Sequence, residues 1–281
     1  MIVVADSGAT KAQWRVIMPN GEVHAFETIG LNPYHSDKEE YLAALEGAFP
    51  FDPSKVKYLH FYGAGCGTDE KAEEAGNSLL SFFSNTIIAT IYSDIMGAAH
   101  ALFADSKGIV IILGTGANVG YYNGDWVEQA TPSLGYILGD EGSGAYIGKE
   151  FVRMWLYDEL PKRLLKKLDM QYGLNLSGVL NRVYTKPFPA QFLSNFVPFI
   201  AEHIHEPSMD NLVESAFKSF VNKHLIKQPR LHDCDIGVVG SVGYVFKDIL
   251  ERVLQQYGKR ISVCVRYPID RIVEYHMAER C

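Results

Sequence analysis

Cysteine is scarce in this chain of 281 residues. Its four cysteines, Cys66, Cys234, Cys264 and Cys281, lie far apart and form no C-x-x-C pair. This spacing excludes a disulfide framework and a zinc knuckle. No apolar run approaches the roughly 20 residues of a membrane-spanning helix, and the first six residues lack the basic start of a secretory signal. We therefore expect a protein of the reducing cytoplasm with no membrane partner.

Positive charge is also in short supply. The 26 Lys and Arg residues are outnumbered by 33 Asp and Glu, which gives a formal net charge of −7, and no block of five basic residues occurs. A surface of this kind repels phosphate backbones and anionic lipids, so we expect no nucleic-acid partner. Hydrophobic residues make up 47% of the chain, as in ordinary globular proteins. At roughly 150 residues per domain, this length predicts about two domains.

Several catalytic motifs are missing. The sequence has no G-x-x-x-x-G-K-[ST], no H-E-x-x-H and no G-x-S-x-G, which excludes a P-loop enzyme, a zincin and an α/β-hydrolase. His203 and His205 are two residues apart and would point away from each other on a helix, and we expect the histidines not to assemble. Residues 63–67 are rich in glycine but lack the acid of a dinucleotide site. We interpret them as a loop where backbones pass closely.

Short β-type segments alternate with turns and helical segments along the first half of the chain. The predicted strands cover residues 2–6, 11–18, 22–29, 55–62 and 87–93. Asn20-Gly21 between two of these strands is a strong hairpin signal. Residues 69–83 and 95–104 have helical spacing, and Ser93 or Asp94 would cap the second helix. Strands interleaved with helices indicate an α/β fold.

The same pattern returns after residue 107. Residues 108–113 resemble a buried central strand, and a glycine-rich turn, a second strand at 118–122, Asn123-Gly124 and a third strand at 126–130 follow. Aligning Gly8 with Gly116 gives an offset of 108 residues, so the chain is either an internal duplication or a chance recurrence of hairpins. Helical spacing then dominates residues 142–228. The predicted elements after that are strands at 234–239 and 261–265 and helices at 244–257 and 269–280.

Three glycine-bearing turns follow strands, at residues 6–11, 114–118 and 240–243. Glycine lets backbone N–H groups approach an anion, and Ser and Thr hydroxyls add donors. Two such hairpins could hold a polyphosphate from both sides, although each turn alone is also explained as a tight hairpin. Asp6, at the end of the first strand, suits Mg²⁺, which keeps several waters and takes few carboxylates.

Acidic residues stand at two helix starts. Asp94 closes a strand and opens a helix, where it is either a cap or a base that accepts a proton from a substrate hydroxyl. Asp140 and Glu141 lie between glycines directly before another helix. Adjacent carboxylates in such a turn can grip sugar hydroxyls, and they also suit the positive end of a helix dipole.

Five of these segments together resemble a known family. They are residues 3–11, 92–94, 112–118, 138–144 and 239–243. In the same order, they are similar to the motifs of the BadF/BadG/BcrA/BcrD-type ATPases, and within that family to the N-acetylglucosamine kinases, which belong to the actin-like/sugar kinase/Hsp70 ATPase superfamily.

The resemblance implies an α/β fold of two actin-like (ribonuclease H-like) domains, with mixed sheets flanked by helices and an ATP cleft between them. The domains would be residues 1–107, joined by the C-terminal helix 269–281, and residues 108–268, with a helical insertion at 142–228. A homodimer is also implied.

The resemblance further implies an enzyme that uses ATP and Mg²⁺ to phosphorylate the 6-hydroxyl of N-acetylglucosamine or a related amino sugar. Asp94 would be the catalytic base and Asp6 the metal-binding residue. The residues implied in ATP and phosphate binding are Ser7, Gly8, Thr10, Lys11, Gly114, Thr115, Gly116, Gly240, Ser241 and Gly243. Those implied in sugar binding are Asn32, Asp94, Thr115, Asn118, Gly135 and Asp140.

Two other functions stay open at this point. A redox-linked ATPase activator of the same family needs cysteines that bridge an iron–sulfur cluster, and Cys234 and Cys264 do not fall where that bridge requires them. A non-catalytic sugar sensor is permitted by the fold alone. Residues 132–135 read Pro-Ser-Leu-Gly where the kinases have Gly-Gly-Trp-Gly, so the choice among amino sugars is open.

Overall fold

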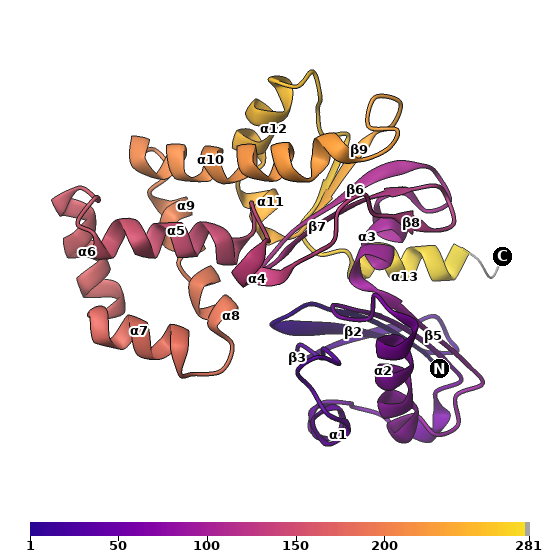
Figure 1. Ribbon diagram of the computed structural model, residues 1–281. Coiled ribbons are helices and arrows are strands. Elements are labelled where there is room, and N and C mark those ends of the chain that lie inside the picture. Colours follow the sequence, from indigo (N-terminus) through magenta and orange to yellow (C-terminus); the bar gives the residue numbers. More distant parts are fainter. Residues whose placement is uncertain (279–281) are drawn as a thin grey trace. The chain divides into compact units, whose positions relative to one another are not determined.

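The computed structural model describes residues 1–278, which form two five-stranded sheets and the helices around them (Figure 1). The chain divides into two compact units. The first contains residues 1–110, 122–128 and 267 onward, and the second contains residues 111–121 and 129–266. The actin-like α/β fold class expected from the resemblance is confirmed by these two mixed sheets and their topology. In the described part of the chain, no helix is both long enough and apolar enough to span a membrane.

The first sheet has the strand order β3-β2-β1-β4-β5. Its strands are β1 (Ile2–Ser7), β2 (Lys11–Ile17), β3 (Val23–Ile29), β4 (Tyr58–Gly63) and β5 (Ile88–Ser93). The first three run antiparallel, which confirms the hairpin predicted at Asn20-Gly21, whereas β1, β4 and β5 are parallel. The predicted strand 55–62 begins later, at Tyr58, because Pro53–Lys55 form a 3₁₀ turn capped by Asp52.

Four helices belong to the first unit: α1 (Lys38–Glu46), α2 (Asp69–Phe82), α3 (Asp94–Phe103) and α13 (Ile269–Ala278). Asp37 and Glu40 form a capping box at α1, and the Thr68 side chain caps α2. Aliphatic and aromatic side chains together fill the core, and Trp14 stacks on Phe26 at 5.5 Å between ring centres. The last residues of the helix predicted at 269–280, and Cys281, lie outside the described residues.

The expectation that the histidines do not assemble was wrong. The Tyr62 hydroxyl lies 2.8 Å from Nδ1 of His100 and 2.9 Å from Nε2 of His276. The ring of His60 stacks on that of His276 at 3.7 Å. These histidines come from β4, α3 and α13, so no local spacing in the sequence could bring them together.

The second sheet has the order β10-β9-β6-β7-β8. Its strands are β6 (Gly108–Leu113), β7 (Ala117–Tyr122), β8 (Val127–Glu128), β9 (Ile236–Val239) and β10 (Val263–Val265). Read from β8, this order repeats that of the first sheet read from β3, which confirms the internal duplication. The predicted register was wrong. β6 begins 106 residues after β1, and β7 begins 106 residues after β2, so Gly8 corresponds to Gly114 and not to Gly116.

A long helical insertion separates β8 from β9, as the helical spacing of residues 142–228 predicts. Its helices are α4 (Gly135–Leu138), α5 (Gly144–Leu156), α6 (Lys162–Tyr172), α7 (Leu176–Tyr184), α8 (Pro189–Ser194), α9 (Val197–Glu202) and α10 (Pro207–Lys223). Proline begins α8 and α10, where its missing N–H has no helical partner to lose. Figure 1 shows α5 and α10 next to each other, and the two helices are in contact.

After β9 the structure differs from the prediction. The expected single helix at 244–257 is two helices, α11 (Ser241–Val245) and α12 (Lys247–Gln255), separated at the buried Phe246. The turn expected at residues 240–243 is therefore shorter than four residues. Gly240 precedes the helix with a φ of +117°, and Ser241 already begins α11.

Candidate functional site

Two aspartates stand at the carboxyl ends of the parallel strands in the first unit. Asp6 on β1 is in register with Tyr62 on β4, which is in register with Tyr92 on β5, and Asp94 follows β5 directly. Neighbouring strands lie about 4.8 Å apart, so the backbones at the two aspartates are separated by roughly two strand spacings. Burial, followed by the charge of Asp94, raises the pKa of Asp6 to about 7.

Asp94 is the first residue of α3, and the N-cap is Ser93, which makes no side-chain cap bond. The positive end of the helix dipole stabilises a carboxylate at this position. Burial, with a contribution from the Asp94 charge, raises the pKa of the Cys66 thiol to about 12. Cys66 is therefore protonated at neutral pH and is a poor nucleophile.

Ser7 connects three segments of the first unit. Its hydroxyl donates to the carbonyl of Leu31 at 3.0 Å and accepts the Leu31 N–H at 2.8 Å, and the residue is completely buried. The Ser7 carbonyl accepts the N–H of Ala64 at 2.7 Å. The side chain therefore fixes the end of β1 to the segment that carries Asn32. Because the hydroxyl is occupied in this way, an anion at this turn would rely on backbone N–H groups.

Asn32 lies where two glycines allow close approach. A Cβ atom on Gly30 would lie 2.3 Å from the Gly8 carbonyl oxygen, and one on Gly65 would lie 2.2 Å from Oδ1 of Asn32. The φ of Gly65 is +89°, a conformation that favours glycine. The close neighbour of Gly65 is therefore the Asn32 side chain and not another backbone, whereas the loop of residues 63–67 meets the backbone of β1 at Ala64, whose N–H donates to the Ser7 carbonyl. Oδ1 of Asn32 also accepts the N–H of Tyr34 at 2.9 Å.

The β1–β2 turn uses its own polar groups to close. The Gly8 N–H donates to the Lys11 carbonyl at 3.1 Å, and the Thr10 carbonyl accepts the Gly30 N–H at 3.1 Å. The exposed ammonium of Lys11 lies 2.6 Å from the carboxylate of Glu27 on β3. Lys11 is therefore a paired cation on the exposed side of β2.

The equivalent turn of the second unit lies against the start of α5. Gly114 donates its N–H to the Gly116 carbonyl at 3.0 Å, and the Gly114 carbonyl accepts the Gly144 N–H at 2.8 Å. The Thr115 carbonyl accepts the next N–H of α5 at 3.1 Å. A Cβ atom on Gly240 would lie 2.3 Å from the Leu113 carbonyl oxygen, so Gly240 is adjacent to this turn.

Asp140 points toward the same turn. Its φ is +56°, and a Cβ atom on Gly116 would lie 3.2 Å from its Oδ2. Burial raises the pKa of Asp140 to about 6, although the hydrogen bond from the Ala117 N–H acts to lower it. With this pKa the Asp140 carboxyl is still mostly ionised at pH 7.

A pocket of the second unit has Asp140 in its wall. Its lining residues are Ala117, Asn118, Val119, Thr131, Pro132, Ser133, Leu134, Asp140, Phe220 and His224. Two predicted sugar-binding residues, Asn118 and Asp140, thus share one pocket, and Gly135 follows directly after its lining segment. The sequence analysis did not predict three of the lining residues, Thr131, Phe220 and His224. Phe220 on α10 and His224 at its end are about 90 residues from Thr131, so no local pattern connects them.

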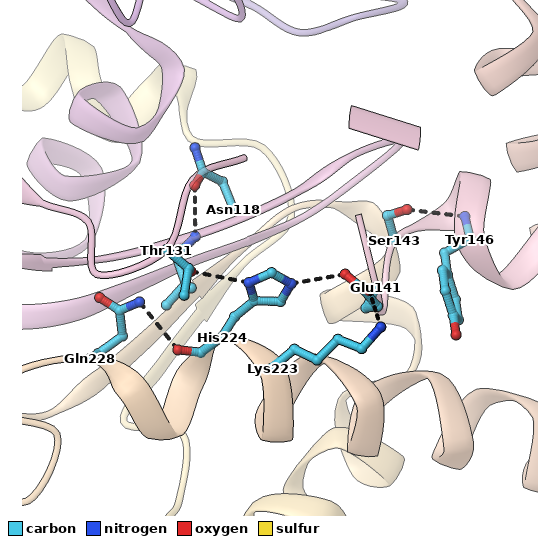
Figure 2. Close-up of polar contacts among 9 residues, drawn as sticks. Asn118, Thr131, Glu141, Ser143, Tyr146, Lys223, His224 and Gln228 are labelled. Atoms are coloured by element: carbon cyan, nitrogen blue, oxygen red, sulfur yellow. Dashed lines mark hydrogen bonds and ion pairs between the residues drawn. The ribbon is translucent and has the colours of Figure 1, made fainter. Parts of the chain in front are cut away.

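The sequence leaves open whether Glu141 binds sugar hydroxyls together with Asp140 or suits the helix dipole, and in the structure its carboxylate is held by two other side chains. Glu141 is 4% exposed, and Figure 2 shows both of its oxygens engaged. Oε1 accepts from the ammonium of Lys223 at 2.5 Å, and Oε2 accepts from Nε2 of His224 at 2.8 Å. Burial acts to raise the pKa of Glu141, but the hydrogen bonds from His224 and Lys223 outweigh it and lower the pKa to about 2. Glu141 is a buried, ionised anchor.

Comparison with known proteins gives no matching family model and no matching curated protein. Among solved structures, the chain is similar to a "putative N-acetylglucosamine kinase" from Porphyromonas gingivalis, with 34% identity, complete coverage of both chains and a TM-score of 0.92. A second protein with that description, from Chromobacterium violaceum, is 18% identical over 98% of both chains, with a TM-score of 0.72.

A third similar structure is a ROK family glucokinase from Streptomyces griseus, solved in complex with glucose and AMPPNP. It is 14% identical over 97% of this chain and 98% of its own, with a TM-score of 0.55. At these identities the second and third structures show the fold alone. The identity of 34% over the complete Porphyromonas gingivalis chain shows more: the chain belongs to the family of that protein, within the actin-like sugar kinase superfamily.

Proposed function

We propose that the protein is an ATP-dependent kinase that phosphorylates the 6-hydroxyl of N-acetylglucosamine or a related amino sugar. The observation that carries this proposal is the pair of carboxylates at the ends of β1 and β5, Asp6 and Asp94, whose charges interact. Phosphoryl transfer to a sugar needs a base for the hydroxyl and a group for the metal ion. The family supports this reading, since one relative is described as a putative N-acetylglucosamine kinase.

Asp94 is the base in this proposal. It is half-buried and stands at the N-terminus of α3, which stabilises its ionised form. An ionised carboxylate can accept the proton of the sugar hydroxyl as that oxygen attacks.

Asp6 fits a magnesium ion. Within residues 1–278, no three His, Cys, Asp or Glu side chains gather into a metal-binding group, and Mg²⁺ is commonly held by one or two carboxylates with its waters retained. The raised pKa of Asp6 indicates an anion that lacks compensating charge. When bound, Mg²⁺ neutralises phosphate charge, and Asp6 would hold it directly or through water.

Two groups of loops would bind the substrates. Backbone N–H groups of the two glycine turns would receive phosphate oxygens, and the nucleotide would be bound by Ser7, Gly8, Thr10, Lys11, Gly114, Thr115, Gly116, Gly240, Ser241 and Gly243. The sugar would be bound by Asn32, Asp94, Thr115, Asn118, Gly135 and Asp140. The carboxylate of Asp140 can accept a hydrogen bond from a sugar hydroxyl. That bond would stabilise the ionised form of Asp140.

The test is a phosphorylation screen of the purified protein with ATP and Mg²⁺. N-acetylglucosamine, N-acetylmannosamine, N-acetylmuramic acid and glucosamine are supplied in turn, ADP release is followed, and the product is identified by mass spectrometry. We expect a 6-phosphate from at least one sugar. Sugar binding without ADP release would instead identify a sugar sensor and overturn the proposal.

A further inference from the structure

A chain of polar contacts crosses the second unit beside the pocket (Figure 2). It begins at the buried carboxylate of Glu141, directly after Asp140, and continues to Nε2 of His224 at 2.8 Å. Nδ1 of His224 lies 3.1 Å from the hydroxyl of Thr131. His224 is the C-cap residue of α10, and it lines the pocket together with Thr131 and Asp140. One imidazole therefore links two walls of the pocket.

We propose that Glu141 and His224 are positioning residues of the sugar pocket. They fix Asp140 on one side and the lining segment 131–134 on the other. This inference rests on the proposed function, because its test measures the KM for the sugar that the pocket binds.

The Asp140 side needs such an anchor. A φ of +56° is uncommon for a residue other than glycine, although aspartate adopts it more readily than most, and glycines at 139 and 142 leave the surrounding backbone free to relax. Glu141 prevents this relaxation because its carboxylate is held by two cationic or polar groups, Lys223 and His224. The fixed backbone keeps the Asp140 carboxylate at the N–H of Ala117.

The Thr131 side is held by the end of α10. Nε2 of His224 faces a carboxylate, which can only accept, so Nε2 is the donor of that bond. Nδ1 lies 3.1 Å from the Thr131 hydroxyl, a group that can both donate and accept. Gln228 adds a second link: its Oε1 accepts the Ala130 N–H at 3.4 Å, and its Nε2 donates to the His224 carbonyl at 3.2 Å. Residues 132–134, which continue the pocket wall, follow directly.

Substitutions at position 224 separate the two arms. A glutamine amide can replace Nε2, so His224→Gln keeps the bond to Glu141 and loses the one to Thr131. An asparagine amide can replace Nδ1, so His224→Asn does the reverse. Thr131→Val removes the hydroxyl at nearly constant volume and keeps the test valid if a His224 variant fails to fold.

We expect His224→Gln, His224→Asn and Thr131→Val each to raise the KM for the sugar about tenfold, with the KM for ATP changed less than about twofold. The double variant His224→Gln/Thr131→Val should show no further rise, because both changes remove the same hydrogen bond. Amide hydrogen exchange of residues 130–134 should be faster in each variant than in the wild type.

Glu214→Gln is the matched control. Glu214 lies on the same helix and pairs with Lys218 at 2.5 Å and Arg252 at 3.0 Å, but it does not line the pocket. Its sugar KM and the exchange of residues 130–134 should not change. The inference is overturned if the wild type is active and both His224→Gln and Thr131→Val keep the wild-type KM for the sugar. A variant that loses only kcat counts as this outcome. A wild type that phosphorylates no amino sugar overturns the proposed function instead.

Discussion

The central strand of the first sheet, β1, ends with Asp6 and Ser7, whereas the equivalent strand of the second sheet, β6, ends with Ile112 and Leu113. The first repeat thus has a carboxylate and a hydroxyl where the second has two apolar side chains. The acid of the second unit, Asp140, comes from its helical insertion. The two repeats therefore have equivalent turns at the ends of their first strands. The acidic residue near the turn comes from the strand itself in the first repeat and from the helical insertion in the second.

The two repeats also fix those turns by different means. In the first, the N–H of Ala64 after β4 donates to the Ser7 carbonyl. In the second, Gly240 after β9 approaches the Leu113 carbonyl so closely that no side chain fits. Both contacts join the loop after the fourth strand of the repeat to the end of its first strand. The comparison therefore predicts different sensitivities to substitution at equivalent places.

We expect the largest difference in kcat between substitutions of two aspartates, Asp94 and Asp270. Each lies in the first turn of the helix that follows the last strand of its repeat. Asp94→Asn at the start of α3 should lower kcat by about 10² to 10⁴-fold, the usual contribution of a general base, with little change in the KM for ATP. Asp270, in the first turn of α13, forms an exposed ion pair with Arg15 at 2.8 Å, which contributes little. Asp270→Asn should leave kcat within twofold in steady-state assays. An Asp94→Asn enzyme within tenfold of the wild type would show that Asp94 is not the base.

Alanine at two close-approach glycines should give the next largest effect. In Gly30→Ala the new Cβ would lie 2.3 Å from the Gly8 carbonyl oxygen, and in Gly240→Ala it would lie 2.3 Å from that of Leu113. Each clash should lower the free energy of unfolding by about 1–3 kcal/mol, and Gly240→Ala should lose more because its φ of +117° adds strain.

Urea unfolding measures these losses, and Gly67→Ala is their control. Gly67 has open space around the position of a Cβ atom, so its substitution should change stability by less than about 0.5 kcal/mol. Equal stability of Gly30→Ala and Gly67→Ala would show that the first hairpin accommodates a side chain there.

Local signals in the sequence were enough to predict the strands and several turns. The apolar run of β6 and the Asn20-Gly21 hairpin are encoded by neighbouring residues, and both are present in the structure. The register of the duplication was not predicted, because the alignment matched Gly8 to the second glycine of the later turn. Strand starts show that Thr10 corresponds to Gly116, since both directly precede the second strand of their repeat.

Pairings between distant residues could not be predicted. Glu141 finds Lys223 and His224 more than 80 residues away, and Ser7 finds Leu31 24 residues away. A sequence shows that Glu141 is acidic and precedes a helix, but burial and partners decide whether its carboxylate is a ligand or an anchor. The same limit applies to Asp6, whose high pKa depends on burial and on the charge of Asp94.

Removing the Ser7 hydroxyl should have a moderate effect on stability. Ser7→Ala leaves the buried N–H and carbonyl of Leu31 without their partner, which should cost about 1–3 kcal/mol. The second repeat has no such bond to lose, because Leu113 occupies the equivalent position. Ser81→Ala is the control, since the exposed Ser81 hydroxyl bonds only within its own helix. If the two variants have the same urea midpoint, the Ser7 bond contributes nothing to stability.

The smallest expected effect concerns the carboxylate that only the first repeat has. With a pKa of about 7, Asp6 is mostly protonated at pH 6 and mostly ionised at pH 8, so kcat/KM should fall about tenfold between pH 8 and pH 6. A cation competes with this proton, and raising the Mg²⁺ concentration should move the acid limb to lower pH. Without Mg²⁺ the sign for stability is the opposite. Because the folded pKa lies above the unfolded value, the stability contributed by the neutral carboxyl is present below about pH 4 and is lost as the pH rises through 7. Asp6→Asn should therefore gain stability relative to the metal-free wild type from pH 4 to pH 8, and an acid limb that ignores Mg²⁺ would exclude Asp6 as the metal-binding residue.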